Sequence, residues 1–206
     1  MKLTIPNQLT IFRIIMTPIF IYAFTLPDKL SRLIATFVFM FAALTDWYDG
    51  YIARRFSMTS RFGQFMDPLA DKILVSGALA VFAYMHYAFI WMVIVIIGRD
   101  FLITFLRIYA LYHGKAIITS NFAKWKTFLQ MAFILALLIY VNIPGLPEVR
   151  LNRVDHPWCQ WTTITLTVVV ILTVFSGVHY LIVNRSHLIE LIKRSFWRFN
   201  ILGLFL

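Results

Sequence analysis

Long apolar stretches follow one another along almost the whole chain, with short polar segments between them. An apolar helix of roughly 20 residues is long enough to cross a lipid bilayer. Six stretches have this length, at about residues 8–26, 31–49, 65–85, 88–112, 123–141 and 161–183. The pattern therefore predicts an all-α integral membrane protein with six transmembrane helices.

The last segment, residues 186–206, has a different pattern. Its apolar residues recur at helical spacing, and its basic residues lie between them; the apolar set is Leu188, Ile189, Ile192, Phe196 and Phe199, and the basic set is Lys193, Arg194 and Arg198. This pattern is typical of an amphipathic helix on a membrane surface. We expect a membrane domain at 1–185 and an amphipathic cytoplasmic tail at 186–206, acting either as an anchor or as a lipid-sensing element.

Composition supports a membrane protein and sets its orientation. The chain has 206 residues, 61% of them hydrophobic, which leaves no room for a separate soluble domain. Its net charge of +10 does not indicate nucleic acid binding, because the basic residues gather in alternate loops. The positive-inside rule places such loops in the cytoplasm, so both termini are expected there. Cys159 is the only cysteine, which excludes an intrachain disulfide and a cysteine-based zinc site.

Acidic residues concentrate in one stretch, where residues 46–71 hold four of the nine in the chain. They fall at helical spacing on two faces, the first carrying Asp46, Asp49, Gly50 and Ala53, and the second carrying Gly63, Asp67 and Asp71. If the faces meet, four carboxylates converge and need a positive partner. Oxygen ligands of this kind suit Mg²⁺ or Mn²⁺, and two such cations suit displacement at phosphorus.

Two alternatives to this metal site remain open from the residues alone. The carboxylates could instead form ion pairs with Arg54, Arg55 and Lys72. The small residues Gly50, Ala53 and Gly63 could admit a bulky substrate or serve close helix packing. Pro68 is also open to two interpretations: it either begins a helix with Asp67 as its cap or lies deeper and interrupts the backbone hydrogen bonds.

A second group of charged residues is basic. Arg99 and Asp100 interrupt the fourth apolar stretch, Arg107 follows two turns later, and Lys124 and Lys126 begin the fifth stretch. Charges within a membrane span are expensive, so we expect them to bind a second anionic substrate, such as a phosphate monoester. The alternative is a structural pair between Asp100 and Arg99 or Arg107, with lysines that only set the topology.

The acidic run resembles a known family. Asp46-x2-Asp49-Gly50-x2-Ala53-Arg54-x8-Gly63-x3-Asp67-x3-Asp71 is similar at every position to the motif of the CDP-alcohol phosphatidyltransferase family. Ile5-Pro6-Asn7-x-Leu9-Thr10-x2-Arg13, Gly98-Arg99-Asp100 and Lys124-x-Lys126-Thr127 resemble its bacterial members that use glycerol 3-phosphate as the acceptor. One difference is Asp100, where that resemblance leads us to expect a glutamate.

The resemblance implies a homodimer of six-helix subunits in the bacterial inner membrane, with an active site open to the cytoplasm. It implies CDP-diacylglycerol binding by Asn7, Asp46, Asp49, Gly50, Ala53, Arg54 and Gly63. It implies two divalent cations, Mg²⁺ or Mn²⁺, on Asp46, Asp49, Asp67 and Asp71, with Asp71 also the general base. It implies that sn-glycerol 3-phosphate binds to Arg99, Arg107, Lys124 and Lys126.

Other functions compete with this one. Within the family the acceptor could be phosphatidylglycerol, serine or inositol phosphate, although the basic residues favour an anionic acceptor. A divalent-cation transporter would also need carboxylates in the membrane, but its sites typically lie near the midplane and the basic group would repel cations. A structural membrane protein leaves the acidic run unexplained.

Overall fold

The structure is a computed structural model that describes the backbone of residues 5–56, 61–112, 121–146 and 157–185. Among these residues the side chains at 5–7, 46, 47, 49–56, 61–65, 67, 121, 122 and 157–160 are not described. All regular structure in the described part is helical. The predicted tail at 186–206 lies outside the described residues.

Six helices form the described part of the chain. Their bounds are α1 Ile5–Thr25, α2 Lys29–Phe56, α3 Arg61–Tyr84, α4 Ile90–Tyr112, α5 Asn121–Asn142 and α6 Pro157–Val183. Each covers most or all of one of the six predicted apolar stretches, so the prediction that every stretch is helical is confirmed. α2 and α3 extend beyond the predicted stretches because the polar residues at their adjoining ends continue the helical conformation.

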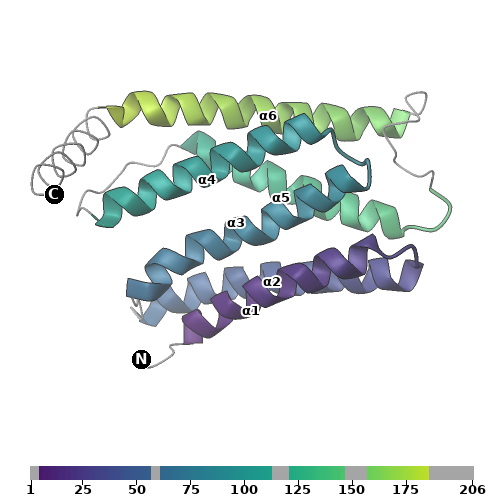
Figure 1. Ribbon diagram of the computed structural model, residues 1–206, viewed down its shortest axis with the longest axis horizontal. Helices are drawn as coiled ribbons and strands as arrows, with labels where there is room; N and C mark the ends of the chain where they lie inside the picture. The colour runs from purple at the N-terminus through teal and green to yellow at the C-terminus, as the bar shows by residue number, and fades with distance from the viewer. Residues whose placement is uncertain (1–4, 57–60, 113–120, 147–156, 186–206) are drawn as a thin grey trace, which may run out of the picture.

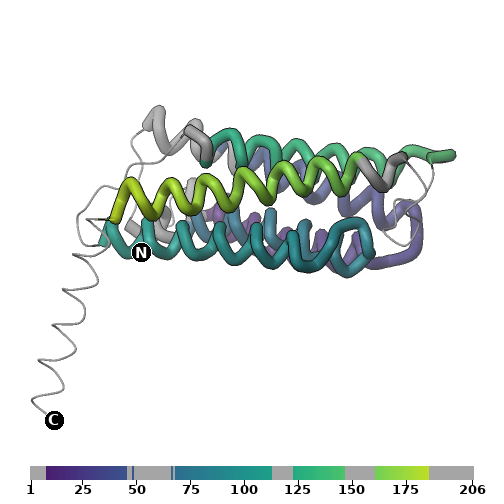
Figure 2. Tube along the Cα trace, turned by 90° about the horizontal axis from the view of Figure 1, so that it is seen from above, coloured from purple at the N-terminus to yellow at the C-terminus, as the bar shows by residue number. Residues whose placement is uncertain are grey.

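The helices lie side by side along the long axis of the molecule and alternate in direction (Figures 1 and 2). α1 packs against α2 and α3, α3 packs against α4, and α6 packs against both α4 and α5. Consequently one end of the bundle holds the end of α2, the start of α3, the end of α4 and the start of α5 (Figure 1). The acidic run and the basic group of the sequence therefore lie at or toward the same end.

The opposite end of the bundle has short turns closed by side chains and backbone. Asp28 precedes α2 and accepts hydrogen bonds from the backbone N–H and the hydroxyl of Ser31, at 3.0 and 3.1 Å. These bonds, led by the backbone one, hold the pKa of the Asp28 carboxyl below its usual value. Two residues after the end of α3, His86 has a φ of 60°, and Tyr87 donates its N–H to the Phe82 carbonyl at 2.8 Å, which completes a Schellman motif.

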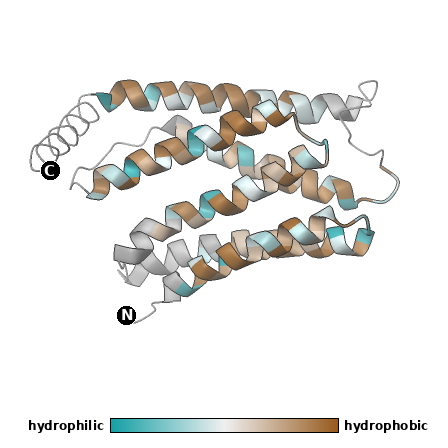
Figure 3. Cartoon of the chain, in the orientation of Figure 1, coloured by the Kyte–Doolittle hydropathy of each residue, from teal (hydrophilic) through white to brown (hydrophobic). Residues whose placement is uncertain are grey.

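Three of the six helices are long and apolar enough, by length and composition, to cross a membrane. They contain Gln8–Thr25, Ala123–Asn142 and Trp161–Val183. α4 does not qualify because Arg99, Asp100 and Arg107 fall within every 18-residue window of it. Figure 3 shows such hydrophilic positions interrupting otherwise apolar helices. The apolar helices make this a membrane protein, and its charged helices pack among the apolar ones.

Aromatic residues fill the centre of the bundle. Phe20, Phe24, Phe39, Phe82 and Phe133 are all almost fully buried. Their rings contact one another at centroid distances of 5.4–6.4 Å, from Phe39 through Phe20, Phe24 and Phe82 to Phe133. This chain of rings joins α1, α2, α3 and α5, so the packing that fixes these helices also fixes the charged residues on them.

One glycine sets the distance between α1 and α3. A Cβ atom at Gly77 would lie 2.9 Å from Cγ2 of Thr17 and 3.2 Å from Cδ1 of Ile21. Thr17 cannot easily move away, since its hydroxyl donates to the Arg13 carbonyl at 3.0 Å. Gly77 therefore permits an approach that a larger residue would prevent, and it brings α3 close to the first helix.

Candidate active site

The acidic run lies on two helices, α2 and α3, whose adjoining ends lie at the same end of the bundle (Figure 1). Residues 46–54 are helical within α2, and residues 63–71 are helical within α3, so the helical spacing used in the prediction is confirmed. The side chains of Asn7, Asp46, Asp49, Asp67 and Arg54 lie outside the described set, as do Ala53 and the two motif glycines, Gly50 and Gly63. Their predicted roles remain predictions.

Pro68 lies inside α3, in its second turn, which decides between the two interpretations of this residue. The helix begins at Arg61, so Asp67 is not its N-terminal cap. Because proline has no N–H, the carbonyl of Gln64 receives no hydrogen bond from position 68. The regular hydrogen-bond pattern of α3 is thus interrupted within the acidic run, three residues before Asp67.

Asp71 is the one predicted metal ligand with a described side chain. It is partly exposed, and its Oδ2 lies 3.3 Å from Nζ of Lys72. Among the described side chains no three histidine, cysteine or acidic residues gather as a metal site. Asp71 offers an accessible carboxylate oxygen, and it lies on the same face of α3 as Asp67, four residues earlier. Carboxylate oxygens are the ligands that Mg²⁺ and Mn²⁺ prefer.

Asp100 lies at the centre of a buried charged network. Nζ of Lys126 on α5 is 2.6 Å from each carboxylate oxygen of Asp100, and Arg99 donates to the same carboxylate at 3.1 Å. The exposed fraction of the side chain is 3% for Asp100 and 0% for Lys126. One carboxylate thus balances a lysine and an arginine from two different helices. The structure therefore contains the structural Arg99–Asp100 pair that was the alternative prediction.

Arg99 also reaches the sixth helix. Its second terminal nitrogen donates to the hydroxyl of Ser176 at 3.0 Å, and that hydroxyl donates to the Thr173 carbonyl at 3.1 Å. A Cβ atom at Gly177 would lie 3.2 Å from Cγ of Arg99, so the absence of a side chain there lets the arginine lie flat against α6. Arg99 is consequently held by Asp100 on one side and Ser176 on the other.

Arg107 and Lys124 differ from the buried pair. Arg107 is half-buried, and within the described residues its Nε has no hydrogen-bond partner. Lys124 is exposed at the start of α5. Of the four predicted phosphate-binding residues, Arg99 and Lys126 share the carboxylate of Asp100. In the described part of the chain, Arg107 is linked to Arg99 only through Tyr180, whose hydroxyl interacts electrostatically with both arginines.

Lys72 connects the acidic run with the basic group. It contacts Asp71 directly, and its charge also interacts with those of Asp100 and Lys126. α3 packs against α4, which brings these residues within electrostatic range. Lys72 therefore lies between Asp71, a predicted metal ligand of the acidic run, and the Asp100–Lys126 pair of the basic group.

Comparison with known proteins identifies the family of the chain. The family model for CDP-alcohol phosphatidyltransferases matches residues 3–188. The chain belongs to this family. The matched range includes the acidic run on α2 and α3, the charged network of α4 and α5, and the whole of α6.

Curated relatives within the CDP-alcohol phosphatidyltransferase family are similar over nearly the whole chain. A CDP-diacylglycerol–glycerol-3-phosphate 3-phosphatidyltransferase from Haemophilus influenzae is 37% identical over 198 residues, covering 94% of this chain and 100% of the relative. A protein of the same name from Yersinia pestis is 36% identical, with 92% and 100% covered. One from Bacillus subtilis is 36% identical, with 85% and 92% covered.

Sequence reasoning did not predict that α6 contacts the charged network around Arg99. Ser176, Gly177 and Tyr180 received no role, because one serine, one glycine and one tyrosine in an apolar stretch give little signal. A usable signal was the adjacent Ser176–Gly177 pair, since small and polar residues mark close helix contacts in membranes. Arg13 was also given no role, although it is a buried arginine in the first helix.

Proposed function

We propose that this protein transfers the phosphatidyl group of CDP-diacylglycerol to sn-glycerol 3-phosphate, producing phosphatidylglycerophosphate and CMP. The observation that carries the proposal is the placement of Lys72, which contacts Asp71 and interacts with Asp100 and Lys126. It joins the acidic motif of the family to a donor-rich group suited to an anionic acceptor. The names of the three relatives state the same donor and acceptor, which supports the proposal.

The acidic motif would bind the donor substrate. Two divalent cations would be held by Asp46, Asp49, Asp67 and Asp71, and they would supply neutralisation of the diphosphate charge. The motif residues Asn7, Gly50, Ala53, Arg54 and Gly63 would contact the cytidine and diphosphate. The small side chains among them leave room for the nucleotide close to the backbone of α2 and α3.

Asp71 would act as the general base for the acceptor. Its accessible carboxylate takes the proton of the primary hydroxyl of glycerol 3-phosphate, and that oxygen forms a bond to the β-phosphorus of the donor. The bond between this phosphorus and the bridging oxygen breaks, and CMP leaves with both bonding electrons. Nζ of Lys72 lies 3.3 Å from Oδ2 of this carboxylate.

The basic group would hold the phosphate of the acceptor. Arg99 and Arg107 supply planar guanidinium donors, which suit phosphate oxygens. Lys124 would add charge at the entrance. Lys126 contacts Asp100 with its ammonium group, so it would contribute by fixing Asp100 and, through it, Arg99. The two arginines lie two helical turns apart on α4.

We propose further that all six helices span the membrane, with the site and both termini on the cytoplasmic side, that the tail lies on the membrane surface, and that the enzyme is a homodimer. Three helices satisfy the length and composition required for a span. α2, α3 and α4 are also long enough, at 28, 24 and 23 residues, and pairing within the bundle offsets the cost of the charges on α4.

The test is CMP release by the purified protein with CDP-diacylglycerol and a panel of acceptors. We expect release that requires glycerol 3-phosphate, stops when EDTA removes divalent cations, and returns with Mg²⁺ or Mn²⁺. Release with phosphatidylglycerol, serine or inositol phosphate instead would replace the acceptor and keep the donor. Folded protein that releases no CMP with any acceptor, but carries metal ions into proteoliposomes, would favour the transporter.

The role of Asp71 has its own test. Asp71→Asn keeps the size of the side chain but cannot accept a proton, so we expect turnover to fall at least about 100-fold, the usual contribution of a general base. Binding of CDP-diacylglycerol, measured by its protection against thermal unfolding, should be largely retained. Turnover equal to that of the parent protein would show that Asp71 is not the base.

A further inference from the structure

Tyr180 on α6 has a buried hydroxyl beside the two arginines of α4. The exposed fraction of its side chain is 4%, and within the described residues its hydroxyl has no hydrogen-bond partner. The same hydroxyl interacts electrostatically with Arg107 and with Arg99. A buried hydroxyl without a partner is costly, and it points to a group that the bound state supplies.

The neighbouring groups show which kind of partner is missing. Nε of Arg99 and Nε of Arg107 are also buried without a hydrogen-bond acceptor among the described residues. Arginine nitrogens can only donate, and a tyrosine hydroxyl can donate as well. Three buried donors on α4 and α6 therefore have no acceptor among the described residues. A ligand with several acceptor oxygens and negative charge, such as a phosphate monoester, satisfies such a set.

The backbone of α6 holds Tyr180 in position. Asn184 donates both its backbone N–H and its side-chain amide to the Tyr180 carbonyl, at 3.1 and 3.0 Å. Four residues earlier, Ser176 binds Arg99 at 3.0 Å, which fixes the register of α6 against α4. Tyr180 thus lies in the last turn of α6, which Asn184 closes and which follows the contact between Ser176 and Arg99.

We propose that Tyr180 is a substrate-binding residue whose hydroxyl donates a hydrogen bond to the phosphate of the acceptor, together with Arg99 and Arg107. This inference rests on the proposed function and adds α6 to the acceptor site. Arginine alone supplies charge, and any anion meets that requirement. A neutral donor at a fixed position adds a geometric requirement that a tetrahedral phosphate meets and that a planar carboxylate meets less well.

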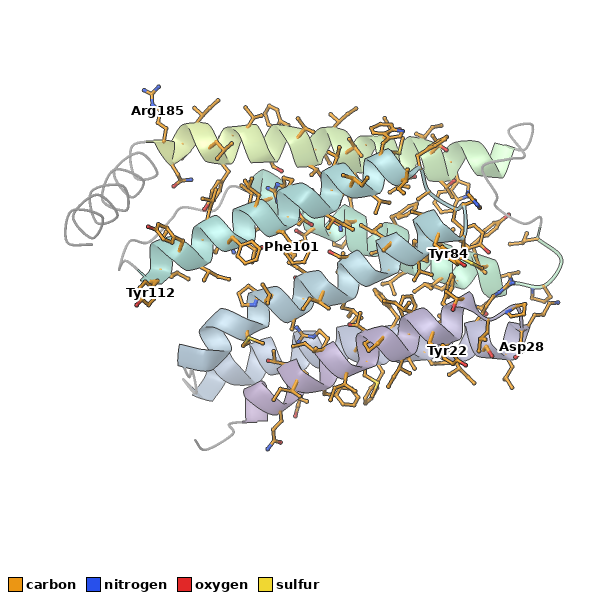
Figure 4. The ribbon with its side chains drawn as sticks, viewed as in Figure 1. Tyr22, Asp28, Tyr84, Phe101, Tyr112 and Arg185 are labelled. Carbon is orange, nitrogen blue, oxygen red and sulfur yellow. The ribbon has the colours of Figure 1, made fainter. Side chains whose placement is uncertain are left out.

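Tyr180→Phe tests the role, because it removes the hydroxyl and keeps the ring. We expect the KM for glycerol 3-phosphate to rise about tenfold, the usual effect of losing one hydrogen bond to a charged group, with the KM for CDP-diacylglycerol and kcat unchanged. Tyr84→Phe is the matched control, since Tyr84 is 72% exposed toward the other end of the bundle (Figure 4). It should leave both KM values at the parental level.

A second measurement separates this inference from the proposed function. The unfolding temperature of the parent protein in detergent should increase when inorganic phosphate or glycerol 3-phosphate is added. The increase should be smaller for Tyr180→Phe. Without anion the variant should be no less stable than the parent. If the parent releases no CMP but shows this difference, the proposed function fails and the anion site stands. Equal protection of parent and variant, an unchanged KM, or no protection of the parent would overturn the inference.

Discussion

The contact between Lys126 and Asp100 makes a strong prediction about stability. Both side chains are buried, and the lysine ammonium lies 2.6 Å from each carboxylate oxygen. Removing one member of such a pair leaves an uncompensated charge in a region that water does not reach, at a cost of about 3–5 kcal/mol. Lys126→Met and Asp100→Leu perturb the two sides of the contact separately.

The two variants should not cost the same. Lys126→Met leaves Asp100 with a second partner, Arg99 at 3.1 Å, so its cost should lie near about 3 kcal/mol. Asp100→Leu leaves the Lys126 ammonium buried with no other hydrogen-bond acceptor among the described residues, so its cost should approach about 5 kcal/mol. In a chain of this size these values correspond to a lower unfolding temperature by about 6–12 and 10–20 °C.

The assay is thermal unfolding in detergent micelles, followed by circular dichroism, for the parent, both single variants and the double variant. Because the double variant has an apolar pair and leaves neither charge of the original contact behind, it should be more stable than Asp100→Leu, despite carrying one more substitution. Two single variants as stable as the parent would show that the contact contributes nothing. Strictly additive losses would show that the two side chains do not interact.

Two further predictions concern glycine packing and the hold on Arg99. Gly77→Ala should destabilise the protein by about 1–3 kcal/mol, because the new Cβ would lie 2.9 Å from Cγ2 of Thr17. Gly98→Ala is the control, since a Cβ there meets nothing within 4 Å, and it should be neutral or stabilise the protein by up to about 1 kcal/mol. Thermal unfolding of both variants measures this, and equal effects would refute the packing argument. Ser176→Ala removes the hydroxyl that holds Arg99 and should raise the KM for glycerol 3-phosphate about tenfold. Ser176→Thr keeps a hydroxyl and should return this KM to the parental value. Parental kinetics in the alanine variant would show that Ser176 does not position Arg99.

The number and approximate positions of the helices were predictable, because each follows from an apolar stretch long enough to cross a membrane. Each apolar stretch of about 20 residues became a helix, and the errors lie only at the ends. α2 continues from its apolar part through the acidic motif to Phe56, where polarity suggested a boundary near residue 49. Polarity marks where a helix leaves an apolar environment, but the backbone hydrogen bonds continue beyond that point, so the two boundaries differ.

The site was predictable only where residues lie close together in the sequence. Helical spacing placed Asp67 and Asp71 on one face, and it placed Arg99 and Arg107 on another, since residues three, four, seven or eight apart share a face. The partners of Arg99 could not be found in this way. Asp100 is its neighbour in the chain, but Ser176 is 77 positions away, and that contact depends on which helices pack together and in what register.

The position of Asp100 explains how an expensive set of charges is tolerated in α4. Arg99 and Asp100 are consecutive, so their side chains leave the helix about a quarter turn apart and reach different neighbours. Asp100 binds Lys126 on α5, and Arg99 binds Ser176 on α6, so one pair of adjacent residues ties three helices together. One carboxylate offsets two cations, which leaves the network with net positive charge near Arg107 and Tyr180, each of which has a buried donor without a partner among the described residues. If the proposed acceptor site is correct, the contacts that stabilise the bundle also position the positive charge that binds the acceptor.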